Sequence, residues 1–181
     1  MLKKITITGG LDKDGHPERV QRLDIGAGEV VGVVGPTGSG KTQLISDIEQ
    51  YADGETLTGR SILIDGQTLQ QSVEVRNLRH LVAQVSQNMN FVIDMTIEEF
   101  LIMHTQVRSI GSPRQIIREV LSMCNELSGE PVSLTDNLTR LSGGQSRALM
   151  VADVAMISQA PIVLIDEIEN AGIDRKKALD L

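Results

Sequence analysis

The sequence Gly35-Pro-Thr-Gly-Ser-Gly-Lys-Thr42 fits the pattern G-x-x-x-x-G-K-[ST], which predicts a phosphate-binding loop. The run Val30 to Val34 precedes it and apolar residues at helical spacing follow it, so we expect the loop to join a strand to a helix. Glycines let backbone N–H groups turn inward around phosphates, and the helix N-terminus adds partial positive charge. Lys41 adds a full charge, and the Thr42 hydroxyl can coordinate Mg²⁺. The predicted phosphate contacts are Gly35, Pro36, Thr37, Gly38, Ser39, Gly40, Lys41, Thr42 and Gln43.

A second motif, Ile162-Val-Leu-Ile-Asp-Glu167, is an apolar run that ends in two acids. In a parallel sheet the carboxyl ends of strands open on the rim where loops bind ligands, so Asp166 can face the Mg²⁺ held by Thr42. Glu167, one residue further on, can polarise an attacking water. Such a pair alone is also typical of ordinary surface charge. Together with the phosphate loop it indicates hydrolysis.

A third motif, Leu141-Ser-Gly-Gly-Gln145, precedes that strand. A serine and two glycines at a helix start favour binding of an anion, although the same residues also occur as an ordinary N-cap. A chain with two phosphate-binding segments suggests that two chains enclose two nucleotides between them. The residues assigned to this second contact are Ser142, Gly143, Gly144 and Gln145.

Composition narrows the functional classes. The 181 residues suffice for one domain, or for a core with a modest insert. The net charge of −7 opposes a broad nucleic-acid surface, and only three aromatic residues (Tyr51, Phe91 and Phe100) could stack on bases. Cys124, the single cysteine, lies in an apolar helical stripe and is expected in the core. Without a signal peptide or a long apolar run, a membrane role would require a partner.

The order of apolar patterns predicts an α/β fold. Short strand-like runs occur at Ile5 and Ile7, Val20 to Ile25, Val30 to Val34, Ser61 to Ile64, Leu81 to Val85 and Ile162 to Ile165. The last run is continuous and is typical of a buried, central parallel strand.

Helical patterns dominate after about Asn88. Thr96 with Glu99, and Ser112-Pro113 with Gln115, are two predicted capping boxes. A third helix should run from about Gly144 to Ser158 and be buried. An apolar stripe is formed by Ile116, Ile117, Val120, Leu121, Cys124 and Leu127. We therefore expect a core of residues 1–87 and 141–181, and a helical subdomain of residues 88–140 that leads into the third helix.

These motifs, in this order, resemble the nucleotide-binding subunit of the ATP-binding cassette (ABC) family. Gly35 to Thr42 is similar to its Walker A loop, Leu141 to Gln145 to its LSGGQ signature, and Ile162 to Glu167 to Walker B with the catalytic glutamate. Val85-Ser-Gln87 and the following Thr96 to Leu101 resemble the Q-loop region, and Ala171 to Asp174 resembles the D-loop.

The resemblance implies a P-loop NTPase core with a mixed or parallel sheet, N-terminal antiparallel strands and a helical insert carrying the signature. ATP and Mg²⁺ are the implied cofactors. Glu167, Gln87 and Lys41 would be catalytic, with Thr42, Gln87 and Asp166 at the metal. It further implies a homo- or heterodimer of such subunits, and a transmembrane permease partner that holds them at the inner, cytoplasmic face of a membrane. The stretch Gln87 to Phe100 would meet that partner.

The sequence also departs from the family pattern. The segment Leu11 to His16 lacks the usual adenine-stacking aromatic, and Asp153 occupies a position where Arg is frequent. The sequence ends at Leu181, before the family's switch histidine, so we expect a truncated chain with impaired hydrolysis. Two alternatives to a transporter ATPase stay open: a soluble ABC ATPase of repair, translation or cofactor assembly, and a regulatory module that hydrolyses ATP poorly.

Overall fold

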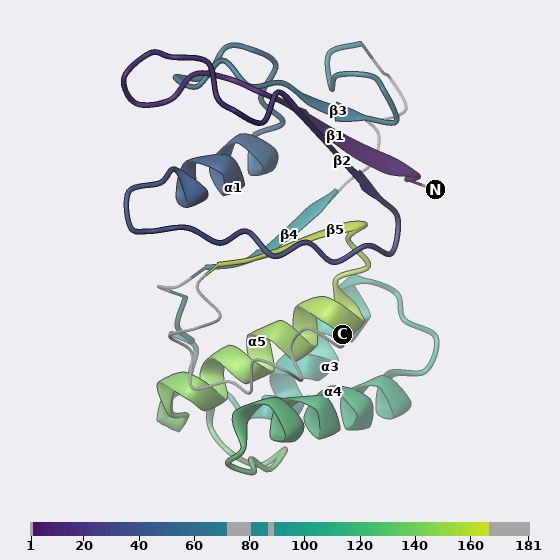
Figure 1. Ribbon diagram of the computed structural model, residues 1–181. Helices are drawn as coiled ribbons and strands as arrows, with labels where there is room; N and C mark the ends of the chain where they lie inside the picture. Colours follow the sequence, from purple (N-terminus) through teal and green to yellow (C-terminus); the bar gives the residue numbers. More distant parts are fainter. Residues whose placement is uncertain (1, 72–80, 87–88, 167–181) are drawn as a thin grey trace. The chain divides into compact units, whose positions relative to one another are not determined.

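The computed structural model describes residues 2–71, 81–86 and 89–166, which fall into two compact units, 1–82 and 83–181 (Figure 1). In chain order the elements are β1 (Lys4–Thr8), β2 (Arg22–Gly26), α1 (Lys41–Glu49), β3 (Ile62–Ile64), β4 (Val82–Val85), α3 (Ile97–Val107), α4 (Pro113–Ser128), the 3₁₀ turn η1 (Leu138–Arg140), α5 (Gly143–Ile157) and β5 (Ile162–Ile165).

The first unit contains an antiparallel sheet with the strand order β2-β1-β3. Ile5 pairs with Ile25 and Ile64, and Ile7 pairs with Leu23 and Ile62, so one face of the sheet is apolar. This register follows from the alternation of apolar and polar residues in β1, because successive side chains of a strand point to opposite faces. The predicted N-terminal antiparallel strands are confirmed.

Helix α1 has few apolar anchors. Its buried residues are Asp47 and Ile48, and the chain that follows it joins the sheet through a hydrogen bond from Ile62 N to Ala52 O of 2.7 Å. Asp47 is fully buried and pairs with Arg60, whose Nη1 lies 2.7 Å from Asp47 Oδ2. A nine-residue helix is unstable alone, so these contacts hold α1 in place.

The strand predicted at Val30 to Val34 is wrong. None of these residues lies in a strand, and the side chains of its four valines are 44% to 94% exposed. A strand persists only where a neighbouring strand takes up its backbone N–H and C=O groups, and no described strand pairs with this run. The phosphate loop is therefore followed by the predicted helix but not preceded by a described strand.

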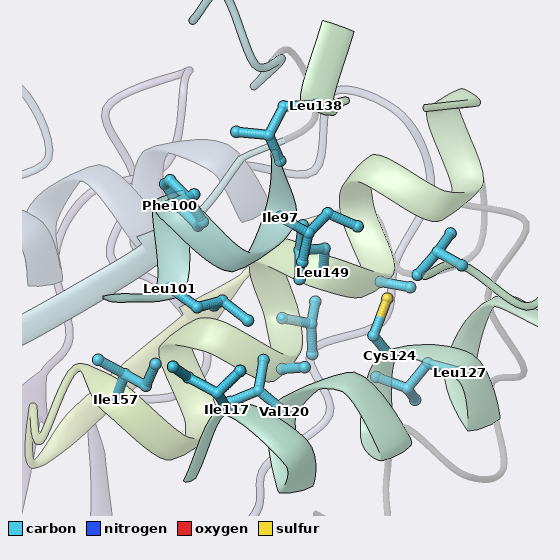
Figure 2. Packing of buried hydrophobic residues seen from close by; sticks show 14 of the residues in the cluster. Ile97, Phe100, Leu101, Ile117, Val120, Cys124, Leu127, Leu138, Leu149 and Ile157 are labelled. Atoms are coloured by element: carbon cyan, nitrogen blue, oxygen red, sulfur yellow. The ribbon is translucent and has the colours of Figure 1, made fainter. Parts of the chain in front are cut away.

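The helices of the second unit enclose one apolar core (Figure 2). Helix α5 lies against both α3 and α4, and seven of its residues are buried. The predicted apolar stripe of α4 is confirmed, since it contributes Ile117, Val120, Cys124 and Leu127 to this core. Burial raises the pKa of the Cys124 thiol to about 11, so the thiol stays protonated and packs as an apolar group.

One of the two predicted capping boxes is present. The Thr96 hydroxyl accepts a hydrogen bond from Glu99 N, and the Glu99 carboxylate accepts one from Thr96 N at 2.8 Å. Ser112 is the N-cap of α4, but its side chain makes no capping hydrogen bond. The second box is therefore wrong, whereas Pro113 does occupy the first turn. The backbone at Ser112, with φ of −133° and ψ of 66°, departs from the extended geometry seen at Thr96.

A polar contact also joins α3 to α5. His104 Nδ1 lies 3.0 Å from both carboxylate oxygens of Asp153, and the His104 ring packs at 4.1 Å from the ring of Phe100. Asp153 is 7% exposed, so this contact satisfies a buried carboxylate. Asp153, which occupies a position where the family often has Arg, thus pairs with His104 in this chain.

Strands β4 and β5 form a two-stranded sheet. A hydrogen bond of 2.9 Å from Asp166 N to Val85 O joins their carboxyl ends, as parallel pairing requires. The expectation of a buried central strand at Ile162 to Ile165 is not met, because Val163 is 42% exposed and β4 is its one partner among the described strands. No helix in the described ranges is long and apolar enough to cross a bilayer.

We predict that Leu101→Ala lowers the free energy of unfolding by about 2 to 5 kcal/mol, because Leu101 is fully buried between the helices. The neighbouring Ile102 is 38% exposed, so Ile102→Ala is the matched control and should change stability by less than about 1 kcal/mol. Urea denaturation followed by far-UV circular dichroism measures both. Equal losses would contradict the packing described for α3.

Candidate functional site

Residues 35–39 of the loop are exposed, and Gly40 at its end is half-buried. Gly40 is the N-cap of α1 and has φ of +89°, in the left-handed region that other residues rarely adopt. A Cβ at Gly35 would lie 2.7 Å from Ser39 Oγ, so the loop folds closely back on itself there. The loop reverses direction at the start of the helix, as the sequence pattern predicts.

The start of α1 is electropositive. Its N-cap makes no side-chain hydrogen bond and its first turn contains no acidic residue, so its first N–H groups carry the partial positive charge of the helix dipole. Lys41 Nζ donates to Gly35 O at 2.7 Å and to Pro36 O at 3.1 Å. The lysine ammonium therefore lies over the loop, where a bound phosphate would compete with two neutral carbonyls for it.

Thr42 and Gln43 complete this first turn, and both are exposed. The Gln43 side chain donates to Asp47 Oδ1 at 3.3 Å, which connects the first turn of α1 to the buried end of the helix. The prediction that Gln43 contacts a nucleotide stays a prediction.

The segment Ser142 to Gln145 begins α5 in the second unit. Ser142 Oγ accepts from Gln145 N at 3.2 Å, and Gln145 Oε1 accepts from Ser142 N at 2.9 Å. This reciprocal capping box gives the helix a defined start. The first two residues of the helix are Gly143 and Gly144, which have no side chains. The ordinary N-cap that the motif allows is therefore present, while a role in phosphate binding stays a prediction.

Asp166 directly follows β5 and lies beside the carboxyl end of β4 through its hydrogen bond to Val85. Gln87 comes two residues after Val85, and Glu167 directly follows Asp166. Both of these residues, and the segment Ala171 to Asp174, lie outside the described residues. The topology thus brings the strand ends that precede Gln87 and Glu167 to one edge of the sheet.

The donor set suits Mg²⁺. The described residues contain no cluster of three or more His, Cys, Asp or Glu side chains able to hold a metal by themselves. Mg²⁺ is instead commonly bound by one or two protein oxygens, with water and phosphate oxygens completing its shell. The Thr42 hydroxyl of the first unit and the Asp166 carboxylate of the second are each an oxygen ligand of this kind, so the chemistry of these two side chains fits the ion.

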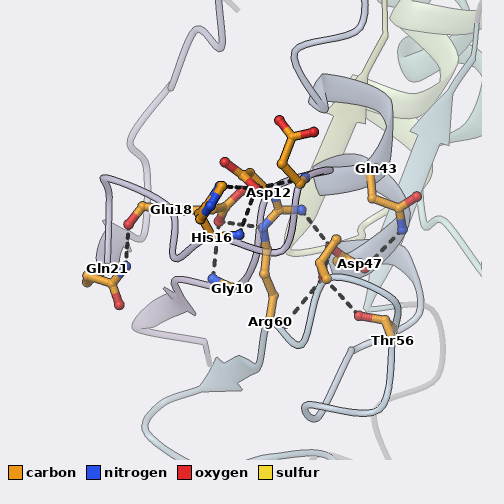
Figure 3. A network of polar contacts seen from close by, with 11 residues as sticks. Gly10, Asp12, His16, Glu18, Gln21, Gln43, Asp47, Thr56 and Arg60 are labelled. Carbon is orange, nitrogen blue, oxygen red and sulfur yellow. Dashed lines mark hydrogen bonds and ion pairs between the residues drawn. The ribbon is translucent and has the colours of Figure 1, made fainter.

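The structure also contains a buried ionic network that the sequence patterns did not reveal (Figure 3). Arg60 pairs with Glu18 and with Asp47, and Arg60 itself is 7% exposed. The partners are far apart in the chain, and none of them belongs to a recognisable motif. The one local signal that could have identified Asp47 is an acid placed beside Ile48, within the helical spacing of apolar residues.

Comparisons with known proteins agree with these motifs. A sequence model of the family described as "ABC transporter" matches residues 19–170. An uncharacterized ABC transporter ATP-binding protein of Methanocaldococcus jannaschii is 56% identical over 99% of this chain and 69% of its own length. An ATP-dependent lipid A-core flippase of Cupriavidus pinatubonensis is 33% identical over 82% of this chain, which corresponds to 25% of the flippase.

A solved structure is similar as well. The putative ABC transporter ATP-binding protein of Pyrococcus furiosus superposes with a TM-score of 0.70, at 19% identity, over 98% of this chain and 84% of its own. At that identity the likeness concerns the fold, and it confirms the predicted α/β P-loop class.

We predict that Ser142→Ala lowers the free energy of unfolding by about 1 kcal/mol, because it removes the hydroxyl that caps α5. The same substitution at Ser112, the N-cap of α4 without a capping hydrogen bond, is the control and should change stability by no more than about 0.5 kcal/mol. Chemical denaturation measures the two variants. A larger loss at Ser112 than at Ser142 would refute the assignment of the cap.

Proposed function

The chain belongs to the ABC transporter family of ATP-binding proteins, and on this premise we propose that it is an ATP-hydrolysing subunit that works as a dimer on a separate transmembrane partner. The observation that carries the proposal is the start of α1. There, exposed glycines, an uncapped helix N-terminus and the Lys41 ammonium together form a site for nucleotide phosphates.

Binding begins with an exchange of partners at Lys41. In the structure its ammonium is held by two loop carbonyls, and the β- and γ-phosphates would replace them with charged acceptors. The left-handed backbone at Gly40 directs the chain into the helix, so that the N–H groups of Lys41 and Thr42 belong to its first turn. These groups need no rearrangement of the helix to donate to phosphate oxygens.

Hydrolysis requires residues from the second unit. Mg²⁺ held by Thr42, Asp166 and Gln87 would neutralise charge on the phosphates. Glu167 would accept a proton from the attacking water, and Gln87 would orient that water. Asp166 and Val85 lie at the carboxyl ends of paired strands. This pairing supports placing Asp166, Gln87 and Glu167 at one edge of that sheet.

The start of α5 would act on the nucleotide of a second subunit. Gly143 and Gly144 present backbone without side-chain bulk behind the Ser142 cap, which suits an approach to phosphate. Two subunits would then close head to tail around two ATP molecules and reopen after hydrolysis. We propose that this cycle drives a permease at the inner face of a membrane. The segment from Gln87 to Phe100 would contact it, and several of its apolar side chains are exposed, among them Met89, Val92 and Ile93.

The proposal predicts that Lys41→Ala weakens Mg-ATP binding by about ten- to hundredfold, the effect of losing a charged hydrogen-bond donor, without unfolding the chain. Lys13→Ala, which removes an exposed lysine of the same unit, is the control and should bind like the wild type. Isothermal titration calorimetry measures both affinities. An unchanged affinity in Lys41→Ala would remove the site from this loop.

The chemical and dimer steps are tested by Glu167→Gln. An amide cannot accept the proton of the attacking water but has nearly the same shape, so ATP should still bind, turnover should stop, and a dimer should accumulate on size-exclusion chromatography. Adding Ser142→Arg should abolish that dimer and leave ATP binding by the monomer intact. Adding Ser112→Arg, at the start of α4, should leave the dimer in place. If Ser142→Arg weakens ATP binding by the monomer, the shared site is refuted.

A further inference from the structure

The first unit contains a buried network of charged side chains centred on Arg60 (Figure 3). Arg60 Nε donates to Glu18 Oε2 at 3.0 Å and its Nη2 contacts Glu18 Oε1, while Nη1 donates to Asp47 Oδ2 at 2.7 Å. The guanidinium thus contacts the Glu18 carboxylate with two nitrogens and the Asp47 carboxylate with its third. This use of three donors in a fixed plane is possible for arginine and not for lysine.

Each partner of Arg60 belongs to a different segment. Glu18 comes from the loop between β1 and β2, and Asp47 comes from α1. Arg60 lies two residues before the start of β3. The Thr58 hydroxyl, from the same turn as Arg60, adds a second donor to Asp47 Oδ2 at 2.9 Å. The network therefore fixes the phosphate-loop helix to two pieces of chain that flank the sheet.

The loop that carries Glu18 is closely fitted to Arg60. A Cβ at Gly10 would lie 2.2 Å from Thr58 O and 2.8 Å from Arg60 Cγ, so this contact requires glycine. Gly10 N donates to Glu18 Oε2 at 3.1 Å, and Leu11 N donates to Thr58 O at 2.7 Å. The backbone of the loop thus contacts the segment that carries Arg60, and the Glu18 carboxylate contacts the guanidinium itself.

Helix α1 depends on this network for its position. Its buried residues are Asp47 and Ile48, and Ile48 is the apolar one of the two. The other oxygen of Asp47 accepts from Gln43, which directly follows Thr42. A continuous path of hydrogen bonds therefore runs from Glu18 through Arg60 and Asp47 to the first turn of α1.

We propose that Arg60 is a positioning residue for the nucleotide site: by bridging Glu18 to Asp47 it sets the orientation of α1, and with it the N–H groups and the ammonium that receive the phosphates. This inference rests on the proposed binding of nucleotide phosphates at Gly35 to Thr42. Arg60 acts through Asp47 and α1, and it needs no contact with the nucleotide.

The ionisation of Glu18 is consistent with a permanent pair. The hydrogen bonds and charge of Arg60 hold the pKa of the Glu18 carboxyl below its usual range, so the acid remains ionised at neutral pH. Glu18 and Arg60 therefore stay paired under the conditions in which ATP affinity is measured.

The test is Arg60→Lys in the full chain, with Mg-ATP as the probe. Lysine keeps the charge, which limits the loss of stability, but it cannot bridge Glu18 and Asp47 with the same geometry. We expect the dissociation constant for Mg-ATP to rise about tenfold in a chain that remains folded at the temperature of the titration. The ¹⁵N–¹H resonances of Lys41 and Thr42 should also shift in the nucleotide-free protein, because α1 has moved.

Arg22→Lys is the matched control. Arg22 pairs with Asp24 on the exposed surface of β2, in the same unit and with a similar donor pattern. It should leave both the affinity and the resonances of α1 unchanged. If Arg60→Lys binds Mg-ATP as tightly as the wild type, the positioning role is refuted and Arg60 is merely structural.

A second variant covers the possibility that Arg60→Lys does not fold. Glu18→Gln preserves the contact between Arg60 and Asp47 and weakens the anchor on the other side, so it should fold and raise the dissociation constant about threefold. Wild-type affinity in folded Glu18→Gln would then overturn the proposal. Failure of the wild-type chain itself to bind Mg-ATP would instead refute the proposed function, and with it any role of Arg60 in nucleotide binding.

Discussion

A buried carboxylate must have a partner, and in the first unit the partner of Asp47 is Arg60. Removing one member of such a pair typically costs about 3 to 5 kcal/mol, because the remaining charge stays buried without compensation. The helix that carries Lys41 and Thr42 is short and has one other buried residue, so its place on the sheet depends on this contact. The position of the helix that follows the phosphate loop thus depends partly on side chains outside the loop.

The second unit is held together in a different way. Helix α5 packs against α3 and α4. The core of the unit consists of aliphatic side chains, Cys124 and Phe100. A helix buried on most sides is rigid, and the capping box of Ser142 and Gln145 gives it a defined start. The segment that we propose meets the nucleotide of another subunit therefore lies at the start of a helix with seven buried residues. His104 and Asp153 add a polar contact to the same helix pair.

Local patterns in the sequence predicted those elements whose causes are local. Three such features are present: the left-handed backbone at Gly40, the capping box of Thr96 with Glu99, and the apolar stripe of α4. Each depends on neighbours a few positions away. Val30 to Val34 failed because a strand depends on a partner that an apolar run does not specify. The Ser112 box failed because capping also requires the right backbone angles. The Arg60 network joins positions distant in the chain and had no pattern to reveal it.

If the start of α1 receives the phosphates of ATP, its amide groups should respond to the nucleotide, and NMR can follow them individually. Mg-ATP is titrated into the ¹⁵N-labelled chain and the amide resonances are followed residue by residue. We expect saturable shifts that are largest for residues 35–43, with much smaller changes along β1 and β2. Shifts centred elsewhere in the chain, or no saturable shift at all, would contradict the proposed site at the start of α1.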